Sequence, residues 1–177
     1  MTAHSSSTPL RDSAARDWLL ARGVLAGHAP ALTLVPQEWT TPGVVLRRLW
    51  LTAAELRRAG SDAGATLLVV PLEGVVTFTT QGGATAELGR GRLAALPASA
   101  TLTTAAPSAR LELLSRRPGP APEPAVLASP ALPVLIATAN AILDGPRDPD
   151  EPSRAGLGSA LESLLTAVLA GSPRDGL

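Results

Sequence analysis

The sequence predicts a mainly β fold with added α-helices, in which a β-barrel is followed by an antiparallel helical pair. Between Thr66 and Ser115, short runs of Val, Leu and Thr are separated by glycine or proline turns at intervals of roughly eight to twelve residues. That spacing is typical of an all-β sandwich or barrel. Beyond a Pro-rich stretch, leucines recur at helical spacing in two segments. Aromatic residues make up only 2% of the chain, so we expect an aliphatic core.

The expected organisation has four parts. Residues 1–24 are expected to form a disordered tail and a short N-terminal helix, residues 25–117 the barrel, residues 118–130 a Pro-rich linker, and residues 131–171 a helical hairpin for dimerisation. Pro interrupts both sheets and helices, so the linker is expected to form neither.

The region before the β-rich stretch contains weaker signals. A helix is expected over Ser13–Arg22, and Ala31–Val35 reads as a strand that Pro36 stops. Val44–Leu51 reads as a second strand. Thr52–Ala59 begins with the spacing of a helix capping box, which predicts one or two helical turns.

Composition excludes several classes of function. The 15 basic residues are all arginines, and 15 acidic residues balance them, so clustered positive charge for nucleic acid is absent. The chain has no Cys, which excludes disulfides and thiol catalysis. The N-terminus is polar, and no apolar run reaches the roughly 18 residues of a membrane span. These features fit a cytoplasmic protein.

The stretch VVPLEG, VVTFTT, QGG, ATAEL, GRG, RLAALP and ASATL resembles the repeat of the cupin fold, with its glycines and proline in register. The resemblance implies a jelly-roll type barrel. Metal-binding cupins place His and Glu ligands where this chain has Ser61–Gly64, Leu67 and Leu102. The two histidines, His4 and His28, lie outside the repeat, so we expect no metal and no other cofactor.

A small molecule inside the barrel is the remaining expectation. Arg92 stands where the repeat usually has an acid, and is either an anion-binding group or a solvated turn residue. Arg47 and Arg48 point to opposite faces of one strand, so one of them is expected to face inward. On one assumed register, the candidate ligand-binding residues are Arg47, Trp50, Leu68, Val70, Val76, Phe78, Arg92 and Leu93, with Ala95 on the same wall and Trp39 as an alternative to Trp50 at the mouth.

The C-terminal helices have two interpretations. They cover the open side of the barrel, or their leucine-rich stripes form a subunit interface. The candidate dimerisation residues are Leu132, Leu135, Ile136, Leu161, Leu164, Leu165 and Val168. A helix-turn-helix DNA reader is not expected, because the connection is about ten acidic, Pro-rich residues instead of a turn of about three or four.

A metal-free cupin repeat, a Pro-containing linker and the helices SPALPVLIATANAIL and GSALESLLTAVLAG together resemble the effector-binding and dimerisation domain of AraC-type transcription regulators. The resemblance covers about residues 44–169. It implies a non-enzymatic homodimer that binds a small effector, and DNA binding only through a separate helix-turn-helix domain. The chain is then either a fragment or a standalone relative.

Two alternatives remain open from the sequence. One is a standalone, metal-free cupin-like binding protein or enzyme, although Glu73 and Glu87 are too isolated to predict an acid/base pair. The other is a purely structural dimerisation module with a filled barrel. A cavity of about 300 Å³ or more inside the barrel would favour ligand binding.

Overall fold

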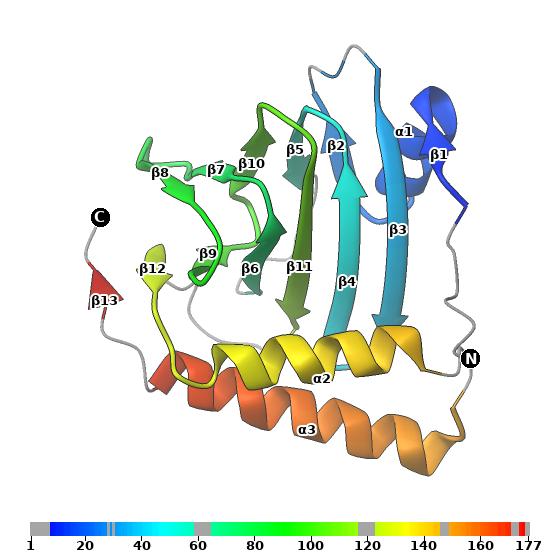
Figure 1. Ribbon diagram of the computed structural model, residues 1–177, viewed down its shortest axis with the longest axis vertical. Helices are drawn as coiled ribbons and strands as arrows, with labels where there is room; N and C mark the ends of the chain where they lie inside the picture. The colour runs from blue at the N-terminus through cyan, green and yellow to red at the C-terminus, as the bar shows by residue number, and fades with distance from the viewer. Residues whose placement is uncertain are drawn as a thin grey trace.

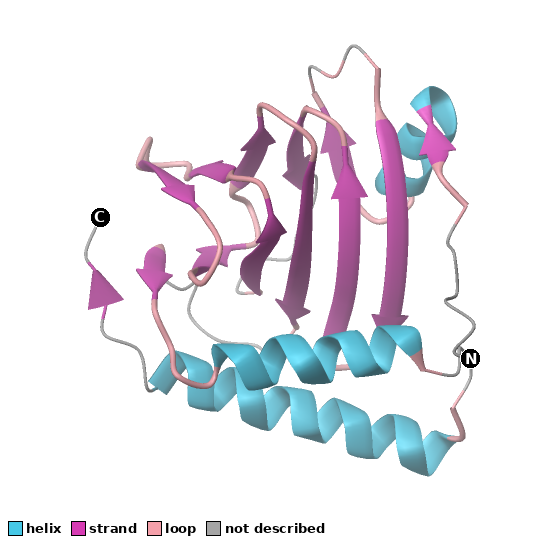
Figure 2. Cartoon of the chain, in the orientation of Figure 1, coloured by secondary structure: helices cyan, strands magenta, loops and turns pink. Residues whose placement is uncertain are grey.

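Two antiparallel β-sheets pack face to face, and two long helices lie on the outer face of the larger sheet (Figure 1). The structure, a computed structural model, describes residues 8–27, 29, 31–58, 65–116, 123–145, 149–170 and 174–175. Figure 2 shows the strands gathered above the helix pair, with a short helix on the far right of the view. The predicted mainly β, cupin-like sandwich with C-terminal helices in contact is confirmed.

The larger sheet has eight strands in the order β1-β3-β4-β11-β6-β9-β12-β13. Residues facing each other across β4 and β11 include Arg47 and Glu112, and Glu38 of β3 lies opposite Arg47. The strands are β1 (Leu10–Arg11), β3 (Thr33–Thr40), β4 (Val44–Leu51), β6 (Thr66–Glu73), β9 (Leu93–Pro97), β11 (Ser108–Ser115), β12 (Ala125–Leu127) and β13 (Arg174–Asp175).

The smaller sheet has five strands in the order β2-β5-β10-β7-β8. They are β2 (Val24–Ala26), β5 (Ala54–Arg58), β7 (Val76–Thr79), β8 (Thr85–Leu88) and β10 (Thr101–Thr104). A hairpin joins β7 and β8, and Gly83 supplies the positive φ of 84° in its loop.

Three helices accompany the sheets in the described part of the chain: α1 (Asp12–Leu20), α2 (Leu132–Asp144) and α3 (Glu151–Ala170). α3 begins at Glu151, directly after Asp150. The reason is that Asp150 Oδ1 accepts a hydrogen bond from the Ser153 backbone N–H at 2.8 Å and so caps the helix.

The core consists of three apolar clusters. The outer cluster joins α2 and α3 to one face of the larger sheet through residues such as Leu46, Leu113 and Leu135. Two inner clusters lie between the sheets. The first inner cluster contains Val45, Leu67, Val69, Val76, Phe78, Leu102 and Leu114, and the second contains Leu19, Leu34, Leu49, Leu51, Ala54 and Leu56, with their neighbours.

The predicted helical turns over Thr52–Ala59 are wrong, because Ala54–Arg58 forms strand β5 between β2 and β10. Ala54 and Leu56 are buried while Glu55 and Arg57 are exposed, which is the period of a strand. Thr52 Oγ1 does not cap a helix. It donates to the Ala31 carbonyl at 2.8 Å and accepts from the Thr33 N–H at 3.0 Å.

Two expectations about proline also need correction. β3 continues through Pro36 instead of ending there, since β1 pairs only with the first two residues of β3 and proline is tolerated at an edge that needs no ladder bond. Within the Pro-rich stretch, Ala125–Leu127 forms β12 and pairs with β9. The linker therefore contributes a short strand to the larger sheet.

Candidate functional site

A layer of charged and polar side chains lies between the two inner apolar clusters. β4 contributes Arg47, and β11 contributes Ser108, Arg110 and Glu112, all of them buried. On each strand these residues share the face of the inner-cluster leucines and valines, because side chains two apart point the same way. We call these four residues the interior polar layer.

The centre of the interior polar layer is an ion pair within β11. Arg110 Nε donates to Glu112 Oε1 at 2.8 Å, and the two side chains are 0% and 6% exposed. Charges buried this deeply are costly unless they are paired. Burial would raise the pKa of Glu112, but the charges of Arg110, Arg58 and Arg47 and the Arg110 hydrogen bond outweigh it and hold that pKa below its ordinary value. Glu112 is therefore an anion at neutral pH.

A second ion-pair chain leads from the layer to the surface. Arg47 Nε donates to Glu38 Oε2 at 2.6 Å, and Arg22 Nε donates to the same oxygen at 2.9 Å. The Arg22 guanidinium lies 3.7 Å from the centre of the Trp18 ring. Partial burial raises the pKa of Glu38, but the hydrogen bonds and charges of the two arginines lower it by more. The pKa is therefore below its ordinary value, and this carboxylate is also ionised.

Part of the layer has no protein partner. Within the described part of the chain, Arg110 Nη1 and Nη2 and Ser108 Oγ are buried and make no hydrogen bond. Both side chains lie on the same face of β11, two residues apart. Next to them the pairing of β11 with β6 shifts register between Ala109 and Arg110, and such irregularities re-aim side chains.

Gly74 packs directly against Ser108. It has a φ of 74°, and a Cβ at this position would lie 3.1 Å from Ser108 Cβ and 3.1 Å from the Pro107 carbonyl oxygen. Glycine is therefore needed here for both its backbone conformation and the space that it leaves beside Ser108.

The structure brings only some of the predicted ligand-binding residues together. Arg47, Val76 and Phe78 face the sandwich interior. The register assumed for Leu68, Val70 and Leu93 is wrong, because these three belong to the outer cluster under the helices, as does Ala95. Their neighbours Leu67, Val69 and Ala94 face inward instead. The central strands are apolar on both faces, so alternation could not show which face was which.

The other predicted residues lie outside the interior. Trp50 is half-buried on the helix-bearing face of β4, and Arg92 is half-buried just before β9. Trp39 packs in the outer cluster. Arg48 points away from Arg47, as expected, and its Nη1 donates to Asn140 Oδ1 of α2 at 2.8 Å.

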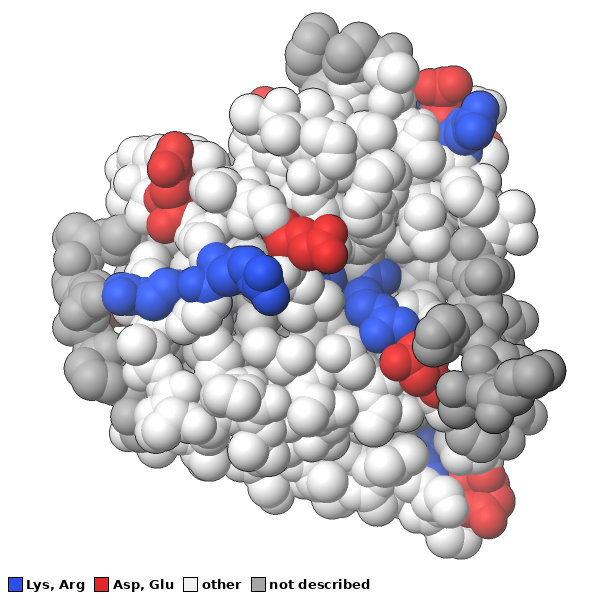
Figure 3. All heavy atoms as spheres, viewed as in Figure 1, with Lys and Arg blue, Asp and Glu red and all other residues white. Residues whose placement is uncertain are grey.

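The predicted dimerisation stripe is already used within the chain. Leu132, Leu135, Leu161, Leu165 and Val168 are buried in the outer cluster, and Ile136 and Leu164 pack half-buried against it. The stripe packs on the outer face of the larger sheet and not over an open side of the barrel. These buried residues are therefore not an exposed surface for a partner subunit, and dimerisation through the helices stays a prediction. The outward helix face exposes Val134, whose exposed fraction is 55%. In Figure 3 that face is nearly free of charge except at its right-hand end.

Three residues of the layer, Ser108, Arg110 and Glu112, were missed by sequence reasoning. A signal was present in SARLELLS, since an arginine and a glutamate alternate with leucines within one strand. Charged residues two apart on a strand with apolar neighbours on both sides indicate a buried ion pair.

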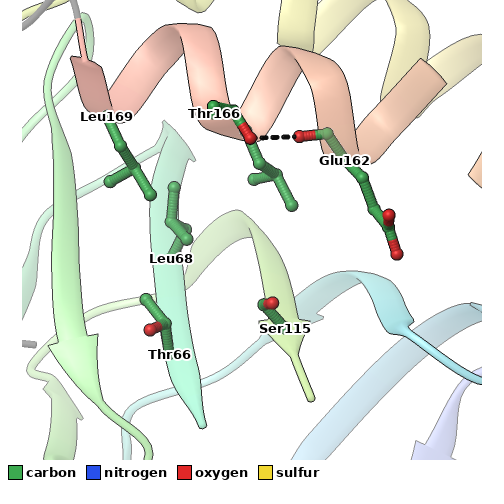
Figure 4. A pocket seen from close by; sticks show the side chains of 7 residues that line it. Thr66, Leu68, Ser115, Glu162, Thr166 and Leu169 are labelled. Carbon is green, nitrogen blue, oxygen red and sulfur yellow. Dashed lines mark hydrogen bonds between the residues drawn. The ribbon is translucent and has the colours of Figure 1, made fainter. Parts of the chain in front are cut away.

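A small cleft lies elsewhere, between the larger sheet and α3. Its volume is about 140 Å³, and its lining residues are Thr66, Leu68, Ser115, Glu162, Leu165, Thr166 and Leu169. Figure 4 shows the side chains of β6 and β11 facing those of α3, where Thr166 Oγ1 donates to the Glu162 carbonyl at 2.9 Å. The cleft is smaller than the roughly 300 Å³ typical of small-molecule sites.

Metal and membrane signals are also absent from the described residues. No group of three or more His, Cys, Asp or Glu side chains is close enough among them to hold a metal ion. His4, His28 and Ser61–Gly64 lie outside the described residues. None of the helices within the described ranges has the length and apolarity needed to cross a bilayer.

No family model and no curated protein matches the chain. Among solved structures, the AraC-like transcriptional activator CuxR is similar over 96% of this chain and 71% of its own, with a TM-score of 0.68 and 12% identity. An RmlC-like cupin from Desulfovibrio desulfuricans gives a TM-score of 0.40 at 18% identity over 47% of this chain and 82% of its own. YlbA from E. coli gives a TM-score of 0.44 at 15% identity, over 71% of this chain and 54% of its own. The likeness to CuxR shows a cupin-like fold, and the two lower scores carry no argument.

Proposed function

We propose that this chain is the small-molecule-sensing and dimerisation domain of an AraC-type transcription regulator. The observation that carries the proposal is the interior polar layer, enclosed between the sheets of a cupin-like sandwich. If the sandwich were only a scaffold, apolar residues at positions 110 and 112 would stabilise it as well as the buried ion pair does. The similarity in fold to CuxR, helix pair included, supports the same proposal.

The structure offers a route from the layer to the helices. Arg47 and Arg48 are neighbours on β4, and they point to opposite faces. Arg47 bonds to Glu38 beside the interior polar layer, and Arg48 bonds to Asn140 and Asp144 of α2. In the proposed mechanism, a ligand in the layer favours one position of β4, which changes how α2 packs and so shifts the population of subunit arrangements.

The proposed homodimer uses the outward face of α2 and α3. Val134 is exposed there, and the surrounding surface carries little charge (Figure 3). Such a face is suited to a second copy of the chain, since self-association tolerates apolar contact better than like charge. DNA binding is assigned to a separate part of the regulator and to none of the residues described.

The role proposed is binding and not catalysis. Glu112 and Glu38 are both ionised and both engaged by arginines, so neither carboxyl is poised to release or take up a proton near neutral pH.

The test is a ligand screen combined with measurements of molar mass. The purified chain is heated with a panel of neutral, anionic and cationic metabolites, and its mass is measured by light scattering with and without each hit. We expect at least one compound to raise the unfolding midpoint in proportion to its concentration and to change the dimer population. A chain that binds nothing and remains monomeric at high concentration contradicts the proposal.

A further inference from the structure

The unused edge of Arg110 is the feature from which a ligand class can be inferred. Its side chain is 0% exposed and uses only Nε to bond Glu112. Nη1 and Nη2 have no hydrogen-bond partner within the described part of the chain. Leaving such donors buried and unmatched costs free energy, and more for a charged group than for a neutral one.

The acidic groups nearby are already engaged. Glu112 accepts from Arg110 Nε, and Glu38 is shared by Arg47 and Arg22. The end of the Arg110 guanidinium therefore remains as a planar pair of donors. Ser108 Oγ, buried on the same face of β11, adds a third polar atom without a partner among the described residues.

We infer that the ligand of the interior polar layer carries a carboxylate, bound by Arg110 Nη1 and Nη2 and by the Ser108 hydroxyl. This inference rests on the proposed sensing function and names its ligand class. A carboxylate presents two coplanar oxygens that match the two parallel N–H bonds of a guanidinium end. The Ser108 hydroxyl then donates to one of the same oxygens.

The surroundings set the rest of the ligand. The buried members of both inner clusters, which flank the layer, are Leu, Val and Ala with Phe78, and Trp18 packs half-buried against the second cluster. The body of the ligand is therefore mainly aliphatic, because most of the buried side chains that flank the layer are aliphatic. Gly74 packs closely beside Ser108, where a Cβ would lie 3.1 Å from Ser108 Cβ.

The experiment compares carboxylates with neutral molecules of the same shape. The full chain is titrated by calorimetry with acetate and butyrate, with acetamide and butyramide, and with phosphate, all at the same ionic strength set by sodium chloride. We expect the carboxylates to bind and the amides not to bind. Ser108→Ala should weaken carboxylate binding about tenfold, the effect of one hydrogen bond to a charged group.

Two variants test whether Arg110 binds the carboxylate. The charge-balanced variant R110M/E112M should lose carboxylate binding, and the exposed Arg57→Met, on the smaller sheet, should keep it. Should R110M/E112M fail to fold, Ser108→Ala and the acid–amide pairs on the wild-type chain still decide the question. Amides that bind as well as their acids, phosphate that binds more tightly than either acid, or a folded R110M/E112M that binds like the wild type would each overturn the inference.

The outcomes also separate this inference from the proposed function. If a neutral compound binds and shifts the dimer population while no carboxylate binds, the sensing function is supported and the carboxylate ligand is contradicted. If carboxylates bind with the variant pattern above but the dimer population does not change, the carboxylate site is supported and the sensing function is contradicted.

Discussion

Glu112→Met tests whether the interior polar layer is held together by its central ion pair. Methionine keeps the length of the side chain and removes only the carboxylate. Arg110, with 0% of its side chain exposed, then stays charged without the acceptor that its Nε uses. Removing one partner of a buried pair costs about 3–5 kcal/mol. The free energy of unfolding of a single domain is about 5–15 kcal/mol in total, so the variant should lose a large fraction of its stability.

The assay is urea unfolding followed by the fluorescence of Trp18, Trp39 and Trp50. Arg110→Met and the double variant R110M/E112M complete a double-mutant cycle. The double variant should be more stable than the sum of the single losses predicts, because two apolar side chains replace a buried pair at little cost. A loss below about 1 kcal/mol for Glu112→Met, or losses that add within about 0.5 kcal/mol, would refute a tightly coupled pair.

The same pair predicts a pH dependence. The pKa of Glu112 is lower in the folded chain than its ordinary value of 4.5. The stabilisation is therefore present at pH values above the unfolded pKa and is lost as the pH falls through the folded pKa. Consequently the stability difference between the wild type and Glu112→Met should be constant near neutral pH and should shrink in acid. A difference that does not change between neutral and acid pH contradicts this.

Three further changes test other parts of the reasoning. Arg48→Ala should cost no more than about 1 kcal/mol, because its ion pair with α2 is partly exposed, yet it should speed amide exchange in α2. Gly74→Ala should destabilise the fold more than Gly83→Ala. Both glycines have a positive φ, which costs an alanine about 1–2 kcal/mol of folding stability at either position. Only at Gly74 do other atoms lie 3.1 Å from the added Cβ. Val134→Arg should lower the dimer population measured by light scattering, while Val75→Arg, at a comparably exposed position away from the helices, should not.

The β-rich stretch was predictable because its turns are set by local chemistry. Gly74 and Gly83 both have the positive φ that such turns need, and β7 and β8 pair across the expected loop. The face of each strand was not predictable. Leu67 and Leu68 are both fully buried, one between the sheets and one under the helices, so burial alone does not distinguish them. Only the position of α2 and α3, a non-local fact, assigns the faces.

The type of element formed by β5 was also not predictable from its local sequence. Its residues are good helix formers, and Thr52 has the spacing of a helix cap. Tertiary pairing with β2 and β10 overrides that preference, because Ala54 and Leu56 complete the second inner cluster. Local propensity is a weak guide where a strand has partners on both sides.

The interior polar layer is where local and global preferences disagree most. Arg110 and Glu112 occupy the middle of a strand whose other central residues are leucines, in a core that aliphatic side chains fill elsewhere. Such a pair adds little stability over apolar residues, and Arg110 keeps donors that the described chain does not satisfy. Sequences depart from local consistency mainly at functional sites. Glu112 lies opposite Arg47, and Arg47 is the neighbour along β4 of Arg48, the arginine that bonds to α2. This placement is the physical reason to look for a ligand between the sheets and for its effect at the helices.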